Sequence, residues 1–416
     1  MRRILTVALV LAAVTAALLP AQAAERQSRV VSDNPVDWTP HVRNGIVYAI
    51  AAAGDTVVVG GDFSQVTEAD GSGTLVQSYL FAFDRGTGKL VRSFRPRLNG
   101  PVRALAAGAN GTVYAGGHFD QVDGESQPAL VRLRLSDGTR YAAIDGPEGG
   151  DVRTLSRAGN YLYAGGTFSR IAGRAQPALA RLNLRTGEWD SGFDLKLAGA
   201  GSARLRIEHL ATSLDGRRLV FDGTFGEVAG QRRFHIALVD IGASPARLTG
   251  WSTEVFREPC SRWFDTYLRD VDFAPDGSYL VVATTGRLTG EEKLCDAALR
   301  FETSGRGDQQ PTWVNKTGGN TLFAVAVTGA AVYVGGHQRW LDNPDGDREA
   351  GPGAVSRVGI GAIDPESGKA LSWNPTRTRG VGVQCLLVTP GGLWVGSDTD
   401  ELGHEYHGRI GVFPTT

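Results

Sequence analysis

The chain has 416 residues, and its 43 Lys and Arg residues against 44 Asp and Glu residues give a formal net charge of −1 at pH 7. No basic patch or tail stands out, which argues against a nucleic acid as partner. Beyond the first 23 residues, no apolar run approaches the roughly 20 residues that cross a bilayer, so no membrane insertion is expected.

Residues 1–23 have the pattern of a secretory signal peptide. Arg2 and Arg3 precede an apolar run from Ile4 to Leu19, and residues 21–23 (AQA) offer a small-residue cleavage site. We therefore expect a secreted, extracellular protein in which residues 24–416 form a single domain.

A predicted strand that ends in two glycines recurs along the chain. The clearest copies are 57–63 (VVVGGDF), 113–119 (VYAGGHF), 162–168 (LYAGGTF) and 332–338 (VYVGGHQ). Weaker copies are 219–225 (LVFDGTF), 279–285 (YLVVATT) and 393–399 (LWVGSDT). The steps between the seven copies run from 49 to 61 residues. A period of this size, built from strands, is typical of β-propellers.

Each repeat predicts four strands. In the second repeat they cover 102–105, 112–116, 129–135 and 139–144, with apolar and polar residues alternating between Gly, Asn and Asp turns. No later segment has a sustained helical period. The predicted fold is all-β, a seven-bladed β-propeller of four-stranded antiparallel blades.

The two ends of the chain suggest how the ring closes. The last repeat stops after its third strand, and residues 36–40 (VDWTP) match the fourth-strand pattern of residues 371–375 (LSWNP). We therefore expect an N-terminal strand near 36–42 to complete blade seven, which would remove an exposed sheet edge.

Connection lengths indicate a working face. The connections after strand two and those leading into strand one are long, and in an antiparallel blade both sets emerge on the same face. The longest cover 257–267, 337–357 and 398–407. Long loops on a rigid scaffold are where binding usually occurs, so we expect the ligand there.

Four titratable residues follow strand two in consecutive blades of the predicted ring: His337, Asp398, Asp62 and His118. They could share a proton, or His337, Asp398 and Asp62 could hold a divalent metal ion, the one cofactor considered. The alternative is that each side chain caps its own strand end.

The second position of strand one is rich in charge. Arg103, Arg153 and Arg269 stand there, near the expected mouth of the channel, and favour an anionic ligand such as a carboxylate or an acidic sugar. The alternative is ion pairing between blades, for instance Arg153 with Glu208.

The late connections mix aromatic, acidic and histidine side chains, which suit a sugar or an aromatic ligand. Trp263 leads into Arg269 and Asp270, and the Phe of the early repeats is replaced by Thr285, Gln338 and Thr399 in these three blades. The remaining candidates are Arg339, Trp340, Asp400, His404 and His407. The alternative reading is blade packing.

Three cysteines complete the candidates. Cys260 and Cys295 flank the first two strands of the fifth repeat, and in an exported protein we expect a disulfide between them. Cys385 lies in an apolar strand and is expected to be a buried free thiol.

The pattern of Val-x-x-Leu, a strand ending in Gly-Gly-x-Phe, and then Leu-x-Arg-Leu resembles the delta-60-repeat β-propeller family of exported bacterial proteins. The segment 260–407 is similar to secreted actinobacterial proteins of unassigned function. The resemblance implies a fold and a location, and it carries no catalytic residues.

No nucleophile elbow and no glycine-rich phosphate loop is present. We therefore expect a secreted, monomeric propeller that binds an extracellular small molecule, glycan or protein through the long loops of one face. The alternative is a secreted hydrolase or lyase that acts on an extracellular glycan, using the Asp, His and Trp side chains of blades five to seven.

Overall fold

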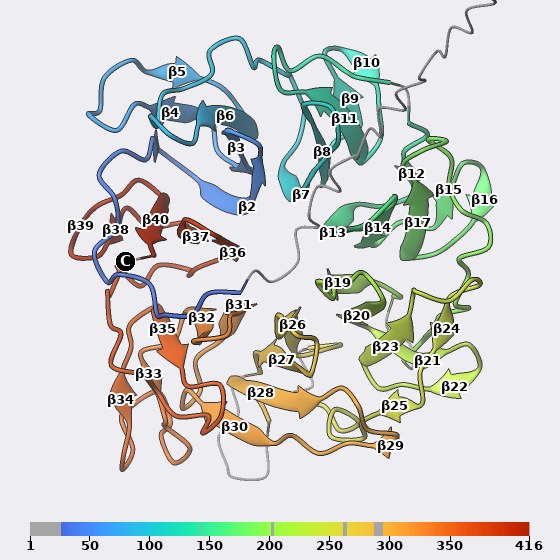
Figure 1. Ribbon diagram of the computed structural model, residues 1–416, viewed down its shortest axis with the longest axis vertical. Coiled ribbons are helices and arrows are strands. Elements are labelled where there is room, and N and C mark those ends of the chain that lie inside the picture. The colour runs from blue at the N-terminus through green and yellow to red at the C-terminus, as the bar shows by residue number, and fades with distance from the viewer. Residues whose placement is uncertain (1–25, 143, 201–203, 261–263, 287–293, 416) are drawn as a thin grey trace, which may run out of the picture.

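The computed structural model describes residues 26–142, 144–200, 204–260, 264–286 and 294–415. All regular elements in these ranges are β-strands. No helix that is long and apolar enough to cross a membrane occurs in them. The strands form sheets that stand around a central channel, the arrangement of a β-propeller (Figure 1). Residues 1–23, the predicted signal peptide, lie outside the described ranges.

Seven sheets, numbered here one to seven in chain order, each contribute one innermost strand to the channel. Neighbouring strands within them are antiparallel. From the centre outward the strands are β2 (Ile46–Ala53), β3 (Thr56–Asp62), β6 (Leu80–Asp84); β7 (Val102–Ala107), β8 (Thr112–Gly117), β11 (Leu130–Arg134); β13 (Val152–Ala158), β14 (Tyr161–Gly166), β17 (Leu179–Asn183); β19 (Ile207–Thr212), β20 (Arg218–Gly223), β23 (Ile236–Asp240), β24 (Arg247–Leu248); β26 (Leu268–Phe273), β27 (Tyr279–Thr284), β28 (Ala297–Glu302), β30 (Trp313–Lys316); β31 (Leu322–Val327), β32 (Val332–Gly336), β35 (Ile360–Ile363); and β36 (Cys385–Thr389), β37 (Gly392–Gly396), β40 (Ile410–Pro414). Each innermost strand lies against the next, and β36 lies against β2.

The expected fourth strand is present in two of the seven sheets, as β24 and β30. In four others it is reduced to a single bridge: Phe83 with Leu90, Leu133 with Arg140, Leu182 with Trp189, and Ile363 with Ala370. The outer segment follows a tight turn, and the twist of the sheet carries it away after one pair. The prediction of a full outer strand was therefore wrong for these four sheets.

The N-terminal segment lies beside the last sheet. The backbone N–H of Ser32 donates to Pro414 O (2.9 Å), and that of Val36 donates to Val412 O (3.0 Å). The strand expected near 36–42 differs from this: residues 41–42 form β1 (His41–Val42), which pairs with β4 (Gln65–Thr67) of the next sheet. Pro35 has no N–H, so a continuous ladder beside β40 cannot form there.

The glycine pair has a packing role at each of its positions. A Cβ atom on Gly116 would lie 2.4 Å from Cγ1 of Val152, on the innermost strand of the next sheet. A Cβ atom on Gly117 would lie 2.1 Å from the carbonyl oxygen of Pro101, on the innermost strand of its own sheet. The first glycine therefore lets neighbouring sheets meet, and the second lets strand two approach strand one.

A β-bulge recurs near the start of the innermost strands. The register of strand one against strand two shifts after Val47, Val102, Val152, Ile207, Leu268 and Leu322. A bulge inserts one extra residue and re-aims the side chains beside it. Consecutive residues can then line the channel, as Glu208 and His209 do, and as Arg269 and Asp270 do.

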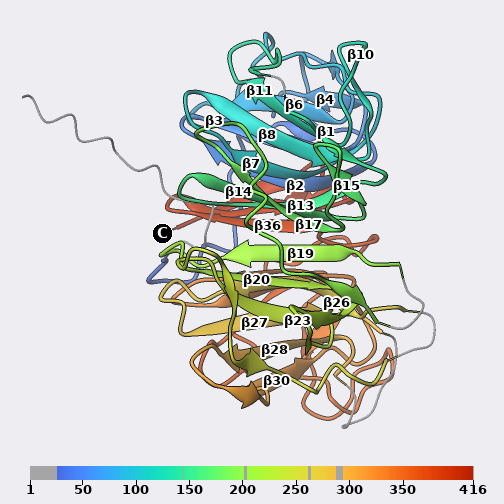
Figure 2. The ribbon, with the colours of Figure 1, turned by 90° about the vertical axis from the view of Figure 1, so that its right-hand side faces the viewer.

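The long connections are ordered rather than open. Most fold into short hairpins, which gather on one face of the ring, at the right-hand side of Figure 2. The hairpins are β4 with β5 (Leu75–Val76), β9 (Gln121–Val122) with β10 (Glu125–Ser126), β15 (Arg170–Ile171) with β16 (Arg174–Ala175), β21 (Phe225–Val228) with β22 (Gln231–Arg232), β33 (Trp340–Leu341) with β34 (Val355–Ser356), and β38 (Glu401–Leu402) with β39 (Glu405–Tyr406). The first strand of several hairpins also pairs with the segment that leads into strand one: β4 with β1, β15 with β12 (Pro147–Glu148), β21 with β18 (Ala198–Gly199), Val122 with Leu98, and Leu402 with Arg377.

Sheet five ties the same two connections together covalently. Cys260 precedes β26, Cys295 follows β27, and the two form a disulfide with their Cα atoms 5.8 Å apart. The predicted disulfide is thus confirmed. Nearby, β25 (Trp251–Ser252) pairs in parallel with β29 (Gly307–Asp308). Cys385 is a free thiol as expected, but it is only half-buried, because it stands on an innermost strand and lines the channel.

Gly116→Ala tests the packing role of the first glycine. The new methyl group would overlap Val152, and overpacking of this kind costs about 1–3 kcal/mol. We expect a lower midpoint of thermal and urea unfolding. Gly391→Ala is the matched control, because its Cβ would find no neighbour closer than 4.0 Å. Equal stability of the two variants would contradict the role.

Cys260→Ser with Cys295→Ser tests the disulfide. The bond closes a loop with a sequence separation of 35 residues. Its loss should lower the free energy of unfolding by about 2–4 kcal/mol. Reduction with dithiothreitol should bring the wild type to the stability of the variant and leave the variant unchanged. A wild type that is insensitive to reduction would contradict this expectation.

Candidate functional site

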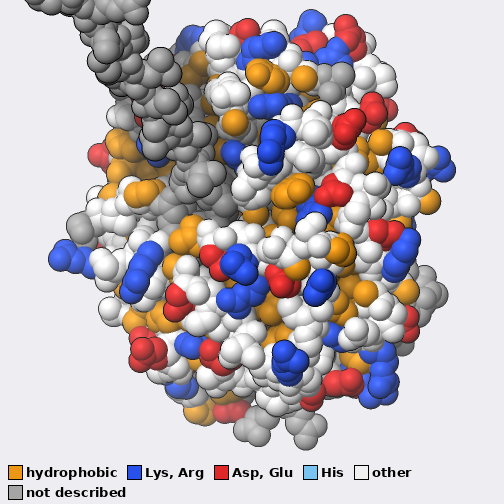
Figure 3. All heavy atoms as spheres, turned by 45° about the vertical axis from the view of Figure 1, so that its right-hand side comes forward, with side chains coloured by type: hydrophobic (Ala, Val, Ile, Leu, Met, Phe, Trp, Pro, Cys, Tyr) orange, Lys and Arg blue, Asp and Glu red, His pale blue; other side chains and the backbone are white. Residues whose placement is uncertain are grey.

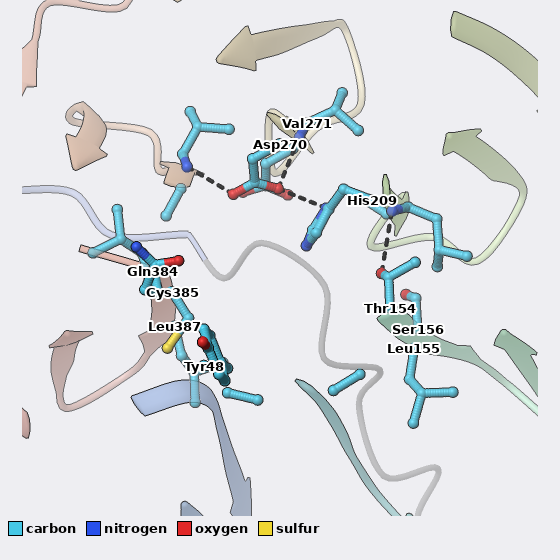
Figure 4. A pocket seen from close by; sticks show the side chains of 18 of the residues that line it. Tyr48, Thr154, Leu155, Ser156, His209, Asp270, Val271, Gln384, Cys385 and Leu387 are labelled. Atoms are coloured by element: carbon cyan, nitrogen blue, oxygen red, sulfur yellow. Dashed lines mark hydrogen bonds and ion pairs between the residues drawn. The ribbon is translucent and has the colours of Figure 1, made fainter. Parts of the chain in front are cut away.

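The innermost strands enclose a cavity of about 300 Å³ in the channel, and all seven of them contribute side chains to it. Figure 4 shows part of its wall, with Tyr48 and Cys385 on one side and His209 and Asp270 on the other. The bulges in strand one bring charged side chains to this wall. They are Arg103, Arg153, Glu208, His209, Arg269, Asp270 and Asp272.

One of the three predicted channel arginines is neutralised by a neighbour. Arg153 Nη1 lies 2.8 Å from Glu208 Oε2 on the next sheet, which confirms the predicted ion pair between blades. Glu208 also pairs with Arg206. Burial alone would raise the pKa of the Glu208 carboxyl, but Arg153 and Arg206 outweigh it and hold that pKa below its ordinary value. Glu208 is therefore ionised at neutral pH.

The other two channel arginines carry charge without a partner of opposite charge. The Arg103 guanidinium lies over the ring of Tyr48, 4.6 Å from its centroid. Arg269 donates to Leu268 O (3.0 Å) and lies 5.5 Å from the ring centroid of Phe264. Neither guanidinium forms an ion pair with a carboxylate among the described residues. Burial lowers the pKa of Arg269, which marks the cost of holding this charge in the channel.

This charge is not part of a wider basic surface on the face drawn in Figure 3. Lys and Arg side chains are interspersed there with Asp and Glu side chains. The near-neutral balance of the whole chain agrees with that view. Positive charge without a carboxylate partner is thus a local property of the channel wall.

A histidine and a carboxylate pair across sheets four and five. His209 Nδ1 lies 2.6 Å from Asp270 Oδ1. Asp270 also accepts the backbone N–H groups of Val271 and Val325, both at 2.8 Å. Burial lowers the pKa of His209, but the negative charge of Asp270 outweighs it, with help from Asp222 and Asp272, and raises it to about 9. His209 is therefore an imidazolium at neutral pH.

Two further buried carboxyl groups stand behind this pair. Asp222 Oδ1 accepts the backbone N–H of His209 (3.0 Å), and Asp272 Oδ2 accepts that of Val327 (2.8 Å). Burial is the largest influence on both, and it raises the pKa to about 8 for Asp222 and to about 7 for Asp272. Asp222 therefore holds a proton at neutral pH.

Sequence reasoning named Asp270 but missed His209, Asp222 and Asp272. A comparison of equivalent positions would have found them. The third position of strand one is small in the other sheets, namely Ala49, Ala104, Thr154, Ala324 and Cys385. Asp222 stands where the clear repeats have the first glycine. A repeat that breaks its own packing rule often does so at a functional site.

The four residues after strand two are not brought together as a metal site. Asp62 is exposed at the end of β3, and His118 pairs with Asp151 (2.6 Å). His337 Nδ1 contacts Gly380 O (2.7 Å), and Asp398 accepts the N–H groups of Val381 (2.6 Å) and Gly382 (2.9 Å). Within the described ranges, no group of three or more His, Cys, Asp or Glu side chains could hold a metal ion.

The late-loop candidates lie on separate hairpins. Arg339 and Asp400 are exposed, and the Arg339 guanidinium lies 5.7 Å from the ring centroid of Trp340. His404 is in the turn between β38 and β39, whereas His407 is buried beside Thr39 (3.3 Å) and Glu405 (3.2 Å). None of these residues lines the channel cavity. Trp263 falls outside the described residues.

The three replacements of the repeated Phe are buried. Thr285 shares a hydrogen bond with Thr321 (2.6 Å), and Thr399 accepts one from Arg377. Gln338 is fully buried, and its amide has no hydrogen-bond partner among the described residues. The two threonines thus have structural contacts of their own.

The buried carboxyl groups predict a pH dependence of stability. An acid whose pKa rises on folding keeps its proton in the folded state, so stability falls as pH rises from the unfolded to the folded pKa. For Asp222 this window runs from about pH 4 to about pH 8. Asp222→Asn keeps the acceptor for His209 and removes the ionisation.

We expect the thermal midpoint of Asp222→Asn to gain on that of the wild type as pH is raised from 4.5 to 8, measured by scanning calorimetry. His209 still contributes a decline above about pH 6.5 in both proteins, because its pKa is raised from 6.5 to about 9. A constant difference across the range would contradict the assignment.

Comparison with known proteins agrees with the fold. The family described as "Domain of unknown function (DUF5122) beta-propeller" matches residues 108–140 and 161–193. A crystal structure of the Myceliophteria thermophila Cps50 (Swd1) beta-propeller domain covers 90% of this chain and 99% of its own, with a TM-score of 0.51 and 12% identity. The computationally designed Ika8 protein covers 92% of this chain and 99% of its own, with a TM-score of 0.49 and 12% identity. No curated protein matches. The chain is therefore a β-propeller that is similar, over two of its repeats, to a propeller family of unknown function.

Proposed function

We propose that this protein is a secreted, seven-bladed β-propeller that binds an anionic small molecule, such as a carboxylate or an acidic sugar, in its central channel. The seven sheets are its blades, and the segment from Ser32 to Val36 completes the seventh. Residues 1–23 are removed as a signal peptide, and residues 24–416 act as one domain and as a monomer. The disulfide between Cys260 and Cys295 supports an oxidising compartment.

The observation that carries this proposal is the pair of channel arginines without a carboxylate partner. Removing a charge from bulk water is costly unless an opposite charge or hydrogen bonds replace the water. Arg153 meets this need with Glu208, whereas Arg103 has a tyrosine ring and Arg269 has backbone carbonyls and a phenyl ring. A ligand carboxylate would supply the missing charge, and a guanidinium can bind it through two parallel hydrogen bonds.

The site of this proposal differs from the expectation of binding by long loops. Those connections are largely folded into hairpins that pair with neighbouring segments, whereas the charge without a carboxylate partner lies in the channel. The hairpins surround the face on which the second residues of strand one, Arg103 and Arg269 among them, open. In this proposal they frame the entrance.

The alternative, a secreted hydrolase or lyase acting on an extracellular glycan, gains no support from the described residues. His337 and Asp398 are each engaged by neighbouring loop backbone, and His407 is buried beside the N-terminal segment. No pair of late-loop acid and base side chains faces a shared cavity in the described part of the chain.

Arg103→Gln and Arg269→Gln test the proposal by titration calorimetry with citrate and glucuronate, and with glucose as the neutral counterpart of glucuronate. Loss of one charged hydrogen bond, worth about 1.5–3 kcal/mol, should weaken anion binding by about 10- to 100-fold. Arg85→Gln removes a charge on an outer turn and should leave affinity unchanged. A wild type that binds neither anion, or channel variants that bind like Arg85→Gln, would overturn the proposal.

A further inference from the structure

We propose that His209 is a ligand-binding residue of the channel, an imidazolium that donates a hydrogen bond from Nε2 to an anionic oxygen of the ligand. The inference rests on the proposed anion-binding function and names a contact and a class of acceptor for it. Its consequence is that the ligand is an oxyanion whose affinity depends on the proton of His209.

The first observation is the position of His209. It stands at the bulge of β19, where equivalent residues in most of the other sheets are small, and it lines the channel cavity. Its side chain keeps 39% of its accessible surface, although the ring is wedged between sheets four and five. A core histidine that served packing alone would be expected to have less contact with the cavity.

The second observation is that the ring is held in one orientation. Nδ1 is fixed by Asp270 (2.6 Å), which is fixed in turn by the N–H groups of Val271 and Val325. The backbone of His209 is held by Asp222, and the next N–H, of Leu210, donates to Thr154 Oγ1 (3.2 Å). Contacts of this kind pre-organise a side chain for binding, because little freedom remains to be lost.

The third observation is the free ring nitrogen. In Figure 4 the second nitrogen of His209 points away from Asp270 and into the open channel. No side chain or carbonyl of the described residues accepts a hydrogen bond from it. The imidazolium therefore has one strong donor committed to the protein and one directed at the cavity.

The charges around His209 favour the protonated form and leave its outward donor unopposed. Facing it are Asp222 from β20, Asp270, Asp272 and Arg269 from β26, and Arg153 from β13, with Glu208 beside it on β19. Asp270 and Asp272 accept backbone N–H groups of β31, and Glu208 is paired with Arg153 and Arg206. None of these carboxylates is free to occupy the outward nitrogen.

This arrangement narrows the ligand class. An arginine offers several donors, whereas the fixed Nε2–H offers a single donor in a single direction. Together with Arg269, the neighbour of Asp270 on the same bulge, it suits a carboxylate or another oxyanion that presents more than one oxygen. A halide or a neutral polyol would lose part of these contacts.

The experiment measures glucuronate and citrate affinity between about pH 6 and pH 10 in the wild type and in His209→Gln, which is neutral and of similar length. We expect wild-type affinity to be steady up to about pH 8. It should then fall toward that of His209→Gln as His209 loses its proton near pH 9. At pH 7 the variant should bind about tenfold more weakly and show no such decline.

Asp270→Asn serves as the test of the positioning residue. Loss of its negative charge lowers the proton affinity of His209, so the decline in affinity should move to lower pH. The same shift should appear in the ¹³C resonance of His209, identified by its absence in His209→Gln. Addition of glucuronate should move that resonance and raise its titration midpoint, a response that a purely structural histidine would not give.

The outcomes separate this inference from the function on which it rests. If the wild type binds no oxyanion, both are overturned. If binding requires Arg103 and Arg269 but His209→Gln binds equally well and the His209 resonance is unmoved by glucuronate, the anion site stands and the role of His209 is wrong. Thermal unfolding of each variant controls for loss of fold, and the resonance of the folded wild type decides where a variant does not fold.

Discussion

The contact between strand two of one sheet and strand one of the next determines most of this molecule. It requires a residue without a side chain, since Gly60, Gly116 and Gly165 each face a β-branched residue of the following sheet at 2.4 to 2.6 Å from a would-be Cβ. Because the same contact recurs, the sheets repeat at a nearly constant angle and return to their origin. The glycines thus set the geometry of the ring, and the ring sets the channel.

The channel in turn imposes an electrostatic constraint. Strand one has to bulge where strand two approaches it, and the bulge turns polar side chains and unpaired N–H groups toward the centre. Thr154, Asp270 and Asp272 satisfy amides of the neighbouring sheet, and Glu208 satisfies Arg153. What stays uncompensated, namely Arg103, Arg269 and the outward nitrogen of His209, is the part of the wall that is available to a ligand.

The repeat was predictable from sequence because the glycine pair is a local signal with a local cause. The Arg153–Glu208 ion pair was predictable for the same reason, since equivalent positions on adjacent blades must meet. The hairpins were missed as ordered elements, although two consecutive residues with positive φ, such as Asp123 with Gly124 and Ala172 with Gly173, mark tight hairpin turns. Sequence spacing alone placed the late-loop residues together. The structure separates them, because each side chain at a strand end bonds to the nearest backbone. His209 became visible only when sheets four and five were seen side by side.

The most direct measurement is the anomalous diffraction of crystals soaked in selenate, an oxyanion that scatters anomalously. If the channel is an oxyanion site, the strongest peak will lie in the cavity, within hydrogen-bonding reach of Arg269 or Arg103 and of His209 Nε2. Peaks confined to the outer surface of the ring, with none in the channel at neutral pH, would contradict it.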